Sequence, residues 1–384
     1  MGRCSSAALL CRPWRPRLRW WRLWGQRAAR IRETRPRSLF SQHLPPSGRY
    51  PGAPSMSFAN LTDFAAADLP CLAPDGREVV IVVVKASFQL TAEGCVPAGK
   101  QAPVRVVDEV YEPEAEQSSV RLPGDLCTEK RGADVVVIGS AVSDKPVTTL
   151  LVGVTIGDRL VPLRVHGERT YYRGAGGRVV VGAAAPFTTK PIVYERAYGG
   201  TSAEHQVVER RNPVGRGVAS DLSELIDQPA PQIEHPAHPI TSGGDRPAPV
   251  EFGAIAMHWS PRCDHLGTID GQWERERMPL MPLDFDRRHH NCAHPDLQLP
   301  EPLAAGTLIG IEGMTRDGAL AFTIPELAIS VAGSYDDGTR QLRQPPIDTL
   351  VVDTENRLAE LTCRAVFPLG RGKRRLRALR VERA

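Results

Sequence analysis

The stretch PLDFDRRHHNCAHPDLQLP, from Pro282 to Pro300, concentrates side chains that can bind a metal ion. Five potential ligands fall within eight residues: His289, His290, Cys292, His294 and Asp296. In an extended chain, side chains at alternate positions point the same way and lie about 6.6–6.8 Å apart. The row from His290 to Asp296 then spans about 20 Å, whereas zinc ligands lie about 2.0–2.3 Å from the ion. A tight turn at Pro295 would bring two or three ligands together, but the pattern favours a structural or surface role without a metal cofactor.

A group of acids near two tryptophans raises the alternative of hydrolysis. The acids are Asp270, Glu274, Glu276, Asp284 and Asp286, and Trp259 and Trp273 lie near them in sequence. Glycosidases use two carboxyl groups about 5–9 Å apart, and sequence proximity does not supply that geometry. Arginines at 262, 275, 277, 287 and 288 equal the acids in number, which favours salt-bridged loops. Since no G-x-S-x-G motif is present, we predict no catalytic residue and keep a metal- or carboxylate-dependent hydrolase as an alternative.

Two glycine-rich motifs precede this region, YERAYGGT (Tyr194–Thr201) and NPVGRG (Asn212–Gly217). Such glycines can cradle a phosphate, but neither G-x-G-x-x-G nor G-x-x-x-x-G-K-[ST] is present. Asn-Pro followed by Gly is first a turn signature. We therefore expect tight turns here, held together by a buried or half-buried ion pair between Glu195 and Arg196.

The charge of the chain is unevenly distributed. Residues 1–55 contain twelve Arg and one acid, whereas the remaining 329 residues carry 36 basic and 43 acidic side chains. No basic stripe with interleaved aromatics follows residue 56, so a nucleic-acid partner is not expected. The head, residues 1–55, is predicted to be a disordered arm or an over-extended start, with a targeting segment as the alternative. Eight scattered Cys without a CxxC motif favour free thiols in the cytosol, and the absence of an 18-residue apolar run argues against membrane insertion.

From residue 77 onward, β-branched runs and alternating patterns predict a mainly β protein. The segments 78–90 and 133–142 read as strands that start with a continuous apolar run. Gly157–Asp158 suits the turn of a two-residue hairpin, because glycine readily takes positive φ. Four hairpins are predicted in all, at 148–167, 170–183, 306–325 and 348–366.

A proline-rich segment, 186–302, separates the strands into two β-rich halves, 57–185 and 303–370. It contains 15 Pro in 117 residues, which breaks regular elements, yet its aromatic residues indicate order. The only short helix predicted there is 220–228, capped by Ser220, and the basic tail 371–384 is predicted to be helical or frayed. The expected fold is therefore two sandwich- or barrel-like antiparallel halves joined by a long ordered loop segment.

Motifs of this segment recur in a fixed order: PFTTKPIVYERAYGGT, NPVGRG, QIEHP, PVEFGAI with WSPR, and GTIDGQWERERMPLMPLDFDRRHHNCAHPDLQ. Together with the flanks NLTDFAAADLPCLAPDGREVV and DTLVVDTENRLAELTCRAVFP, they resemble domain of unknown function family 2169. The resemblance covers about residues 56–368. The family pattern falls on Glu195, Arg196, Gly199, Gly200, Asn212, Pro213, Gly215, Arg216, Gly217, Trp259, Pro261, Arg262, Gly267, Trp273, Pro282, Asp284, Phe285, Asp286, Asn291 and Asp296. The chain departs from the pattern at His289 and His290, where the family tends to carry aromatics, and at Tyr198, where Phe is common.

The resemblance implies a cytoplasmic bacterial adaptor or chaperone encoded beside type VI secretion genes. Its partners would be an effector with a PAAR-like tip and possibly the VgrG spike onto which the effector is loaded. The family implies neither a catalytic residue nor a cofactor. A purely structural component of the secretion apparatus remains a further alternative. For an adaptor, aromatic and Arg side chains on a stiff frame are the expected anchors, and we select Trp259, Trp273, Arg216 and Arg262.

Overall fold

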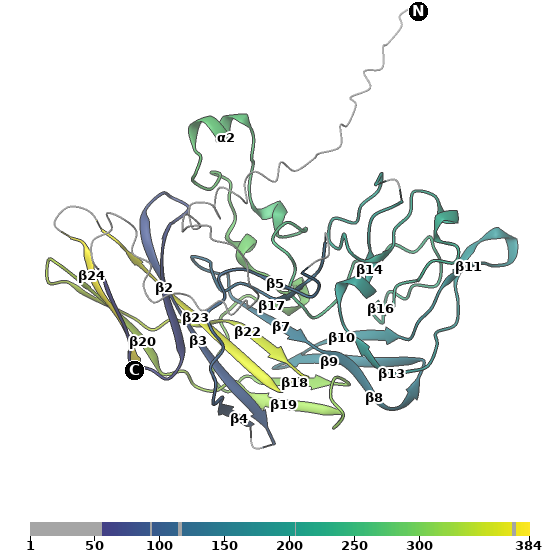
Figure 1. The fold of residues 1–384 in the computed structure, drawn as a ribbon, viewed down its shortest axis with the longest axis horizontal. Helices are drawn as coiled ribbons and strands as arrows, with labels where there is room; N and C mark the ends of the chain where they lie inside the picture. The colour runs from purple at the N-terminus through teal and green to yellow at the C-terminus, as the bar shows by residue number, and fades with distance from the viewer. Residues whose placement is uncertain (1–55, 93, 114–116, 204, 371–373) are drawn as a thin grey trace, which may run out of the picture. The chain divides into compact units, whose positions relative to one another are not determined.

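The apolar run that begins at Glu78 becomes β3 (Glu78–Thr91), a long strand in the largest sheet. In the computed structural model, the described residues are 56–384 except 93, 114–116, 204 and 371–373, so the Arg-rich head lies outside them. The sheet has seven strands, and Figure 1 shows them together with the other sheets. The six in the main order are β17 (Gln298–Leu299), β7 (Ala133–Ile138), β22 (Ile347–Asp353), β23 (Leu358–Pro368), β3 and β2 (Ala65–Leu72), and β4 (Gly94–Pro97) also pairs with β3.

Strands from the two predicted halves share this sheet. β3 pairs with β23 in antiparallel register, and β7 pairs with β22 in parallel register. The mainly β prediction is confirmed, and the two halves are joined by backbone hydrogen bonds between strands, not only by the intervening loops. Sequence separation does not limit such pairing, because a ladder requires only matching backbone geometry and a buried face.

Two further sheets pack on the seven-stranded sheet. The first contains five antiparallel strands in the order β16 (Ile233–Glu234), β10 (Arg159–His166), β9 (Thr149–Ile156), β18 (Leu308–Glu312) and β19 (Ala319–Thr323). The second contains four strands in the order β1 (Ser57–Asn60), β24 (Leu376–Arg383), β20 (Ile329–Tyr335) and β21 (Arg340–Arg343). The remaining strands form pairs: β5 (Glu109–Val110) with β6 (Val120–Leu122), β8 (Ser140–Val147) with β13 (Phe187–Pro191), β11 (Tyr171–Arg173) with β12 (Val179–Val181), and β14 (Tyr198–Gly199) with β15 (Arg216–Gly217).

Strand β3 is long enough for the four-stranded and the five-stranded sheets to pack at different points along one of its faces. Even-numbered residues point to the same face of a strand. Near its start, Val80 and Val84 belong to the core cluster shared with the four-stranded sheet. Further along, Phe88 and Leu90 belong to the larger cluster that includes the five-stranded sheet. A single 14-residue strand therefore contributes to two cores.

The opposite face of the sheet carries buried charges. Lys85 of β3 forms ion pairs with Asp125 and Glu360, and Glu360 also accepts two bonds from Arg105 at 2.5 and 2.8 Å. Further pairs join Arg364 to Asp348 and Lys130 to Asp134. The network thus contains four basic and four acidic side chains. Such a balance avoids an uncompensated buried charge, which is strongly destabilising.

The proline-rich segment folds into short elements that contribute to the main core. Phe252, Trp259 and Tyr194 are at most 2% exposed and belong to the same cluster as β7 and β9. The helical elements among the described residues are short: η1 (Ala175–Gly177), η2 (Tyr194–Arg196), η3 (Leu222–Leu225), η4 (Cys263–His265), α2 (Gly271–Glu276), η5 (Arg287–His290) and η6 (Pro295–Leu297). No helix in the described part of the chain has the length and apolar character needed to cross a bilayer.

The predicted hairpins are confirmed. They correspond to β9–β10, β11–β12, β18–β19 and β22–β23, each paired in antiparallel register. Gly157 has φ of 58°, as the first turn between them requires. The predicted strand 133–142 is divided into β7 and β8 at Gly139, whose φ is 145°.

Two local predictions are wrong. The expected helix 220–228 is only the four-residue η3, and Asp221, not Ser220, caps it by accepting from the Ser223 amide. Residues Leu376–Arg383 of the tail form strand β24 instead of a helix or a frayed end. Buried Leu376, Leu379 and Val381 on this strand pack into the core while it pairs with β1 and β20. That gain in apolar burial and ladder pairing outweighs the helix propensity of its arginines.

Candidate functional site

The two glycine-rich motifs pack against each other around Asn212. This residue is fully buried, and its Nδ2 donates to the Tyr194 carbonyl at 2.8 Å and to the Tyr198 carbonyl at 2.9 Å. Strands β14 and β15 pair beside it in parallel register. A Cβ at Gly199 would lie 2.8 Å from the Asn212 Cβ, and one at Gly215 would lie 2.8 Å from the Ala197 carbonyl oxygen. The motif glycines thus permit close backbone packing, and Pro213 lies in the turn that they surround.

Glu195 and Arg196 do not form the predicted ion pair with each other. Glu195 accepts hydrogen bonds from the Ser119 amide at 2.8 Å and the Ser119 hydroxyl at 2.7 Å. Arg196 donates to Glu168 at 3.1 Å and to Gln232 at 2.6 Å. Adjacent side chains on the short η2 diverge, so each binds a different neighbouring segment. Both residues still hold loops together, which was the role expected of them.

Three basic side chains lie around the Glu168 carboxylate at one edge of this region. Its Oε1 lies 2.7 Å from Lys190 Nζ and 3.1 Å from Arg196, and Arg216 approaches Oε2 at 4.0 Å. These hydrogen bonds and charges lower the pKa of Glu168, although desolvation by burial, the largest single influence, acts in the opposite direction. Arg216 therefore lies beside a shared carboxylate, and its side chain is 31% exposed.

Trp259 and Arg262 belong to the interior of the protein. Trp259 is 1% exposed and meets the Tyr194 ring edge-on, with centroids 5.6 Å apart. The Arg262 guanidinium donates to the Ile255 carbonyl at 2.6 Å and the His289 carbonyl at 3.0 Å. Because both side chains are buried, they stabilise the interior of the protein. They cannot act as the predicted partner anchors unless the structure opens locally.

In the histidine- and cysteine-rich stretch, each residue contacts a different group of the protein. His289 Nδ1 lies 2.9 Å from the Arg262 carbonyl oxygen, whereas His294 Nε2 lies 3.3 Å from the Pro249 carbonyl oxygen. The Cys292 amide donates to Asp134 at 2.9 Å. Burial lowers the pKa of His290 to about 3 and raises that of the Cys292 thiol to about 12, so both side chains are neutral near pH 7. No group of three or more metal-binding side chains occurs among the described residues.

Polar residues of the same stretch join it to the sheet. Asn291 is 1% exposed, and its Nδ2 donates to the Arg131 carbonyl at 3.0 Å and to Asp134 at 3.1 Å. Asp296 lies on the surface, 3.7 Å from Arg159. Asn291 therefore anchors the loop to β7, whereas Asp296 forms an exposed ion pair of little energetic weight.

The acids near the tryptophans stabilise turns. Asp284 accepts from the Thr268 amide at 2.9 Å and from its hydroxyl at 2.7 Å. Asp286 caps η5 and pairs with Arg288, and these hydrogen bonds lower its pKa to about 2. Asp270 caps α2. Each of these three carboxylates has a structural partner within its own loop, and Asp286 alone among them forms a salt bridge.

These contacts fix a hairpin formed by residues 267–285, which we call the α2 hairpin. The bond of Asp284 to Thr268 closes its base, and Trp273 Nε1 donates to the Leu280 carbonyl at 2.9 Å across its tip. Arg277 donates to the Pro74 carbonyl at 3.0 Å and thereby joins the hairpin to the turn before β3. In Figure 1, α2 and its flanking turns extend away from the strands of the seven-stranded sheet.

The α2 hairpin exposes apolar side chains that the sequence motifs did not single out. Leu283 is 86% exposed, Ile269 51% and Met278 41%. The available signal was the composition of MPLMPL, in which proline-punctuated apolar residues cannot form a buried strand. Apolar side chains that form a contiguous exposed surface are typical of interaction sites, and these three belong to one short hairpin.

The buried acid Glu251 lies close enough to Glu195 of η2 for the two charges to interact. Glu251 is 3% exposed and accepts from the Gly253 amide. Burial, assisted by the charge of Glu195, raises the pKa of Glu251 to about 8. The Tyr194 hydroxyl is also buried and has no hydrogen-bond partner among the described residues. The carboxyl group of Glu251 is therefore mainly protonated at neutral pH.

Comparison with known proteins identifies a family for most of the chain. A family model described as an uncharacterized protein conserved in bacteria (DUF2169) matches residues 75–364. The match covers both glycine-rich motifs, the α2 hairpin and the histidine-rich stretch. No curated protein and no solved structure matches this chain.

Proposed function

We propose that this chain, which belongs to the DUF2169 family of uncharacterized proteins conserved in bacteria, is a cytoplasmic adaptor that binds a secretion effector through its α2 hairpin. The effector would carry a PAAR-like tip, and the adaptor would help to load it onto the VgrG spike of a type VI secretion system. The observation that carries the proposal is the exposure of Leu283, Ile269 and Met278 on a hairpin that is fixed at its base and tip.

The contacts of the hairpin favour a binding role over a packing defect. An adaptor must cover apolar surface of its client, and binding weakens when a flexible loop has to be ordered first. Here the Asp284–Thr268 bonds, the Asp270 cap and the link from Arg277 to Pro74 order the hairpin before any partner arrives. Trp273 supplies part of this stiffness through its indole N–H, so its position supports the anchor role expected of it less directly than the exposed aliphatic side chains do.

The energy available from this surface is modest, which is compatible with a complex that has to be released. Complete burial of a Leu, Ile or Met side chain contributes about 1.5–3 kcal/mol. Three such side chains therefore offer a gross gain of several kcal/mol before the cost of association is subtracted. A client held by this surface could then be released at the spike, as the loading step requires.

Co-expression with the effector encoded beside this chain tests the proposal. We expect the effector to co-purify with the wild-type chain and to be lost with Leu283→Glu or Ile269→Glu, because a charge would be buried in the complex. Leu342→Glu is the matched control, since Leu342 is 60% exposed on β21, outside the hairpin. If the effector is equally soluble alone and never co-purifies, the adaptor proposal fails. If only the control disrupts capture, the hairpin is not the contact surface.

A further inference from the structure

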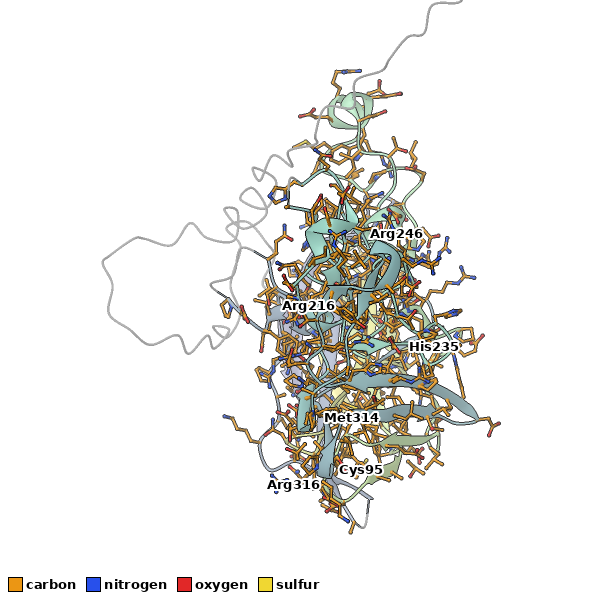
Figure 2. All side chains as sticks on the ribbon, turned by 90° about the vertical axis from the view of Figure 1, so that its right-hand side faces the viewer. Cys95, Arg216, His235, Arg246, Met314 and Arg316 are labelled. Carbon is orange, nitrogen blue, oxygen red and sulfur yellow. The ribbon has the colours of Figure 1, made fainter. Side chains whose placement is uncertain are left out.

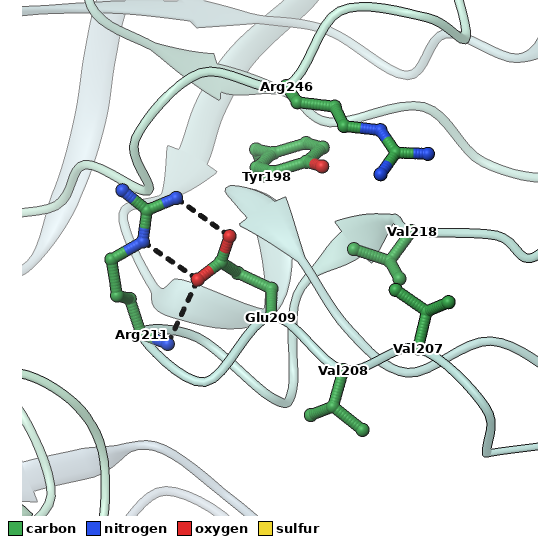
Figure 3. A pocket seen from close by; sticks show the side chains of 7 residues that line it. All are labelled: Tyr198, Val207, Val208, Glu209, Arg211, Val218 and Arg246. Atoms are coloured by element: carbon green, nitrogen blue, oxygen red, sulfur yellow. Dashed lines mark hydrogen bonds and ion pairs between the residues drawn. The ribbon is translucent and has the colours of Figure 1, made fainter. Parts of the chain in front are cut away.

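A cavity of about 310 Å³ lies on the surface of the two glycine-rich motifs, apart from the α2 hairpin. Its lining residues, shown in Figure 3, are Tyr198, Val207, Val208, Glu209, Arg211, Val218 and Arg246. The volume lies at the lower end of the range for small-ligand sites, which suits an occupant of about one or two amino-acid residues.

The rear of the cavity is held by the backbone of the motifs. Tyr198 lies on β14, which pairs with β15. The Glu209 amide donates to the Gly200 carbonyl at 3.0 Å, and the Val218 amide donates to the Gly199 carbonyl at 3.2 Å. The lining is therefore already in place and does not depend on the closure of a loop.

Of the three charged side chains that line the cavity, two neutralise each other and one cation is left to bind a ligand. Arg211 binds Glu209 through two side-chain hydrogen bonds of 2.7 Å, and the Arg211 amide adds a third at 3.1 Å. The Glu209 carboxylate is thus already neutralised by its neighbour. Arg246 is exposed and has no hydrogen bond or ion pair to any other described residue. The net charge of the lining is +1, carried by a guanidinium that can accept a new anionic partner.

The apolar part of the cavity lies next to this cation. In Figure 3 the Tyr198 hydroxyl, the Arg246 guanidinium and Val218 face the same space. Val207 and Val208 are 36% and 43% exposed and extend the apolar wall. A phenol and a guanidinium together can hold one carboxylate. The three valines favour a ligand in which an apolar group is attached to that carboxylate.

We propose that this cavity binds the C-terminal residue of a polypeptide, with Arg246 and Tyr198 holding the terminal carboxylate and the valines holding an apolar side chain. A terminal residue places both groups on one Cα. The side chain of Asp or Glu also supplies a carboxylate, but only one or two methylene groups accompany it. Recognition of this kind is independent of the adaptor proposal, because it concerns a different surface and is tested without an effector.

Short peptides provide the direct test. We would titrate the purified full chain, with isotope-labelled valine methyl groups, with acetyl-Gly-Leu and follow the methyl resonances of Val207, Val208 and Val218. A dissociation constant on the order of 1 mM is expected for so small a ligand. The amide acetyl-Gly-Leu-NH2, the glycine peptide acetyl-Gly-Gly and the side-chain acid acetyl-Gly-Glu-NH2 should each bind at least about tenfold more weakly, since each lacks one of the required groups.

Variants separate the two polar contacts from general damage. Arg246→Gln should weaken acetyl-Gly-Leu at least about tenfold, and Tyr198→Phe should weaken it less, because a charged hydrogen bond is stronger than a neutral one. Arg316→Gln is the control: Arg316 is another exposed arginine, and Figure 2 shows it at the far end of the view from Arg246. Equal binding of the acid and its amide, unaltered binding in Arg246→Gln, or no saturable change for any peptide would overturn the proposal. An unchanged unfolding midpoint in Arg246→Gln would show that a loss of binding does not reflect a loss of folding.

Discussion

Replacement of Glu251 by Gln should remove a large pH dependence from the stability of this protein. The pKa of Glu251 is about 8 in the folded chain, chiefly because burial penalises the carboxylate, against an ordinary value of 4.5. Below about pH 4.5 the side chain is protonated in both the folded and unfolded states, and its contribution to stability is fully present. As the pH rises from 4.5 to 8, the unfolded chain releases this proton while the folded chain retains it, so stability falls.

The size of the effect follows from the linkage between proton binding and folding. Each pH unit in this window costs about 1.4 kcal/mol. Raising the pH from 4.5 to 8 therefore removes on the order of 5 kcal/mol through this one group. That loss is a substantial part of the 5–15 kcal/mol by which folded proteins are typically stable. A glutamine does not titrate, and its amide oxygen can still accept from the Gly253 amide.

Urea unfolding at several pH values between 4 and 9 measures the difference. The free energy of unfolding of Glu251→Gln minus that of the wild type should rise by several kcal/mol between pH 4.5 and 8, and then remain constant. Glu326→Gln, which removes an exposed carboxyl group, controls for the loss of one ionisable side chain. A difference between variant and wild type that does not change with pH would refute the reasoning, because it would mean that Glu251 ionises normally in the folded chain.

Three further perturbations probe the frame of the molecule, each measured by urea unfolding at pH 7. Asn212→Ala should destabilise the protein by about 2–4 kcal/mol, because two buried carbonyls lose their donor; a change below 0.5 kcal/mol, the scatter of ordinary surface substitutions, would contradict this. Gly215→Ala should cost about 1–3 kcal/mol through overpacking, whereas Gly99→Ala, with no neighbour within 4 Å of the added Cβ, should be nearly neutral. Lys85→Met should cost about 3–5 kcal/mol, because it leaves the buried Asp125 carboxylate without its cation and Glu360 paired with Arg105 alone, and retained stability would show that the Lys85 ion pairs contribute little.

Local patterns were sufficient to predict most strands. The hairpins at β9–β10 and β18–β19 follow from alternating apolar residues and a glycine at the turn, and both features act over a few residues. The prediction failed at β24, where the arginines suggested a helix and the decisive partners, β1 and β20, come from distant parts of the chain. The propensity of a short segment is weak compared with the pairing and burial available to it in the folded protein.

The candidate site shows the same division. The motifs around Glu195, Asn212 and Asp284 could be located from the sequence, but their roles depended on partners such as Ser119 and Thr268 that no spacing rule identifies. Trp259 has the residue type of an interface anchor and is nevertheless buried, whereas Leu283, which no motif distinguishes, is 86% exposed.

By itself, the sequence determined the β character of the protein, the positions of its turns, the order of its motifs and the family to which it belongs. These properties depend on residue type and near-neighbour spacing, which are read directly along the chain. The tertiary structure alone decided that strands from both ends share one sheet, that four acids and four bases neutralise each other beneath it, and that Arg246 has no partner among the described residues. Burial and charge pairing depend on distances between residues that lie far apart in sequence, and these distances exist only once the chain has folded.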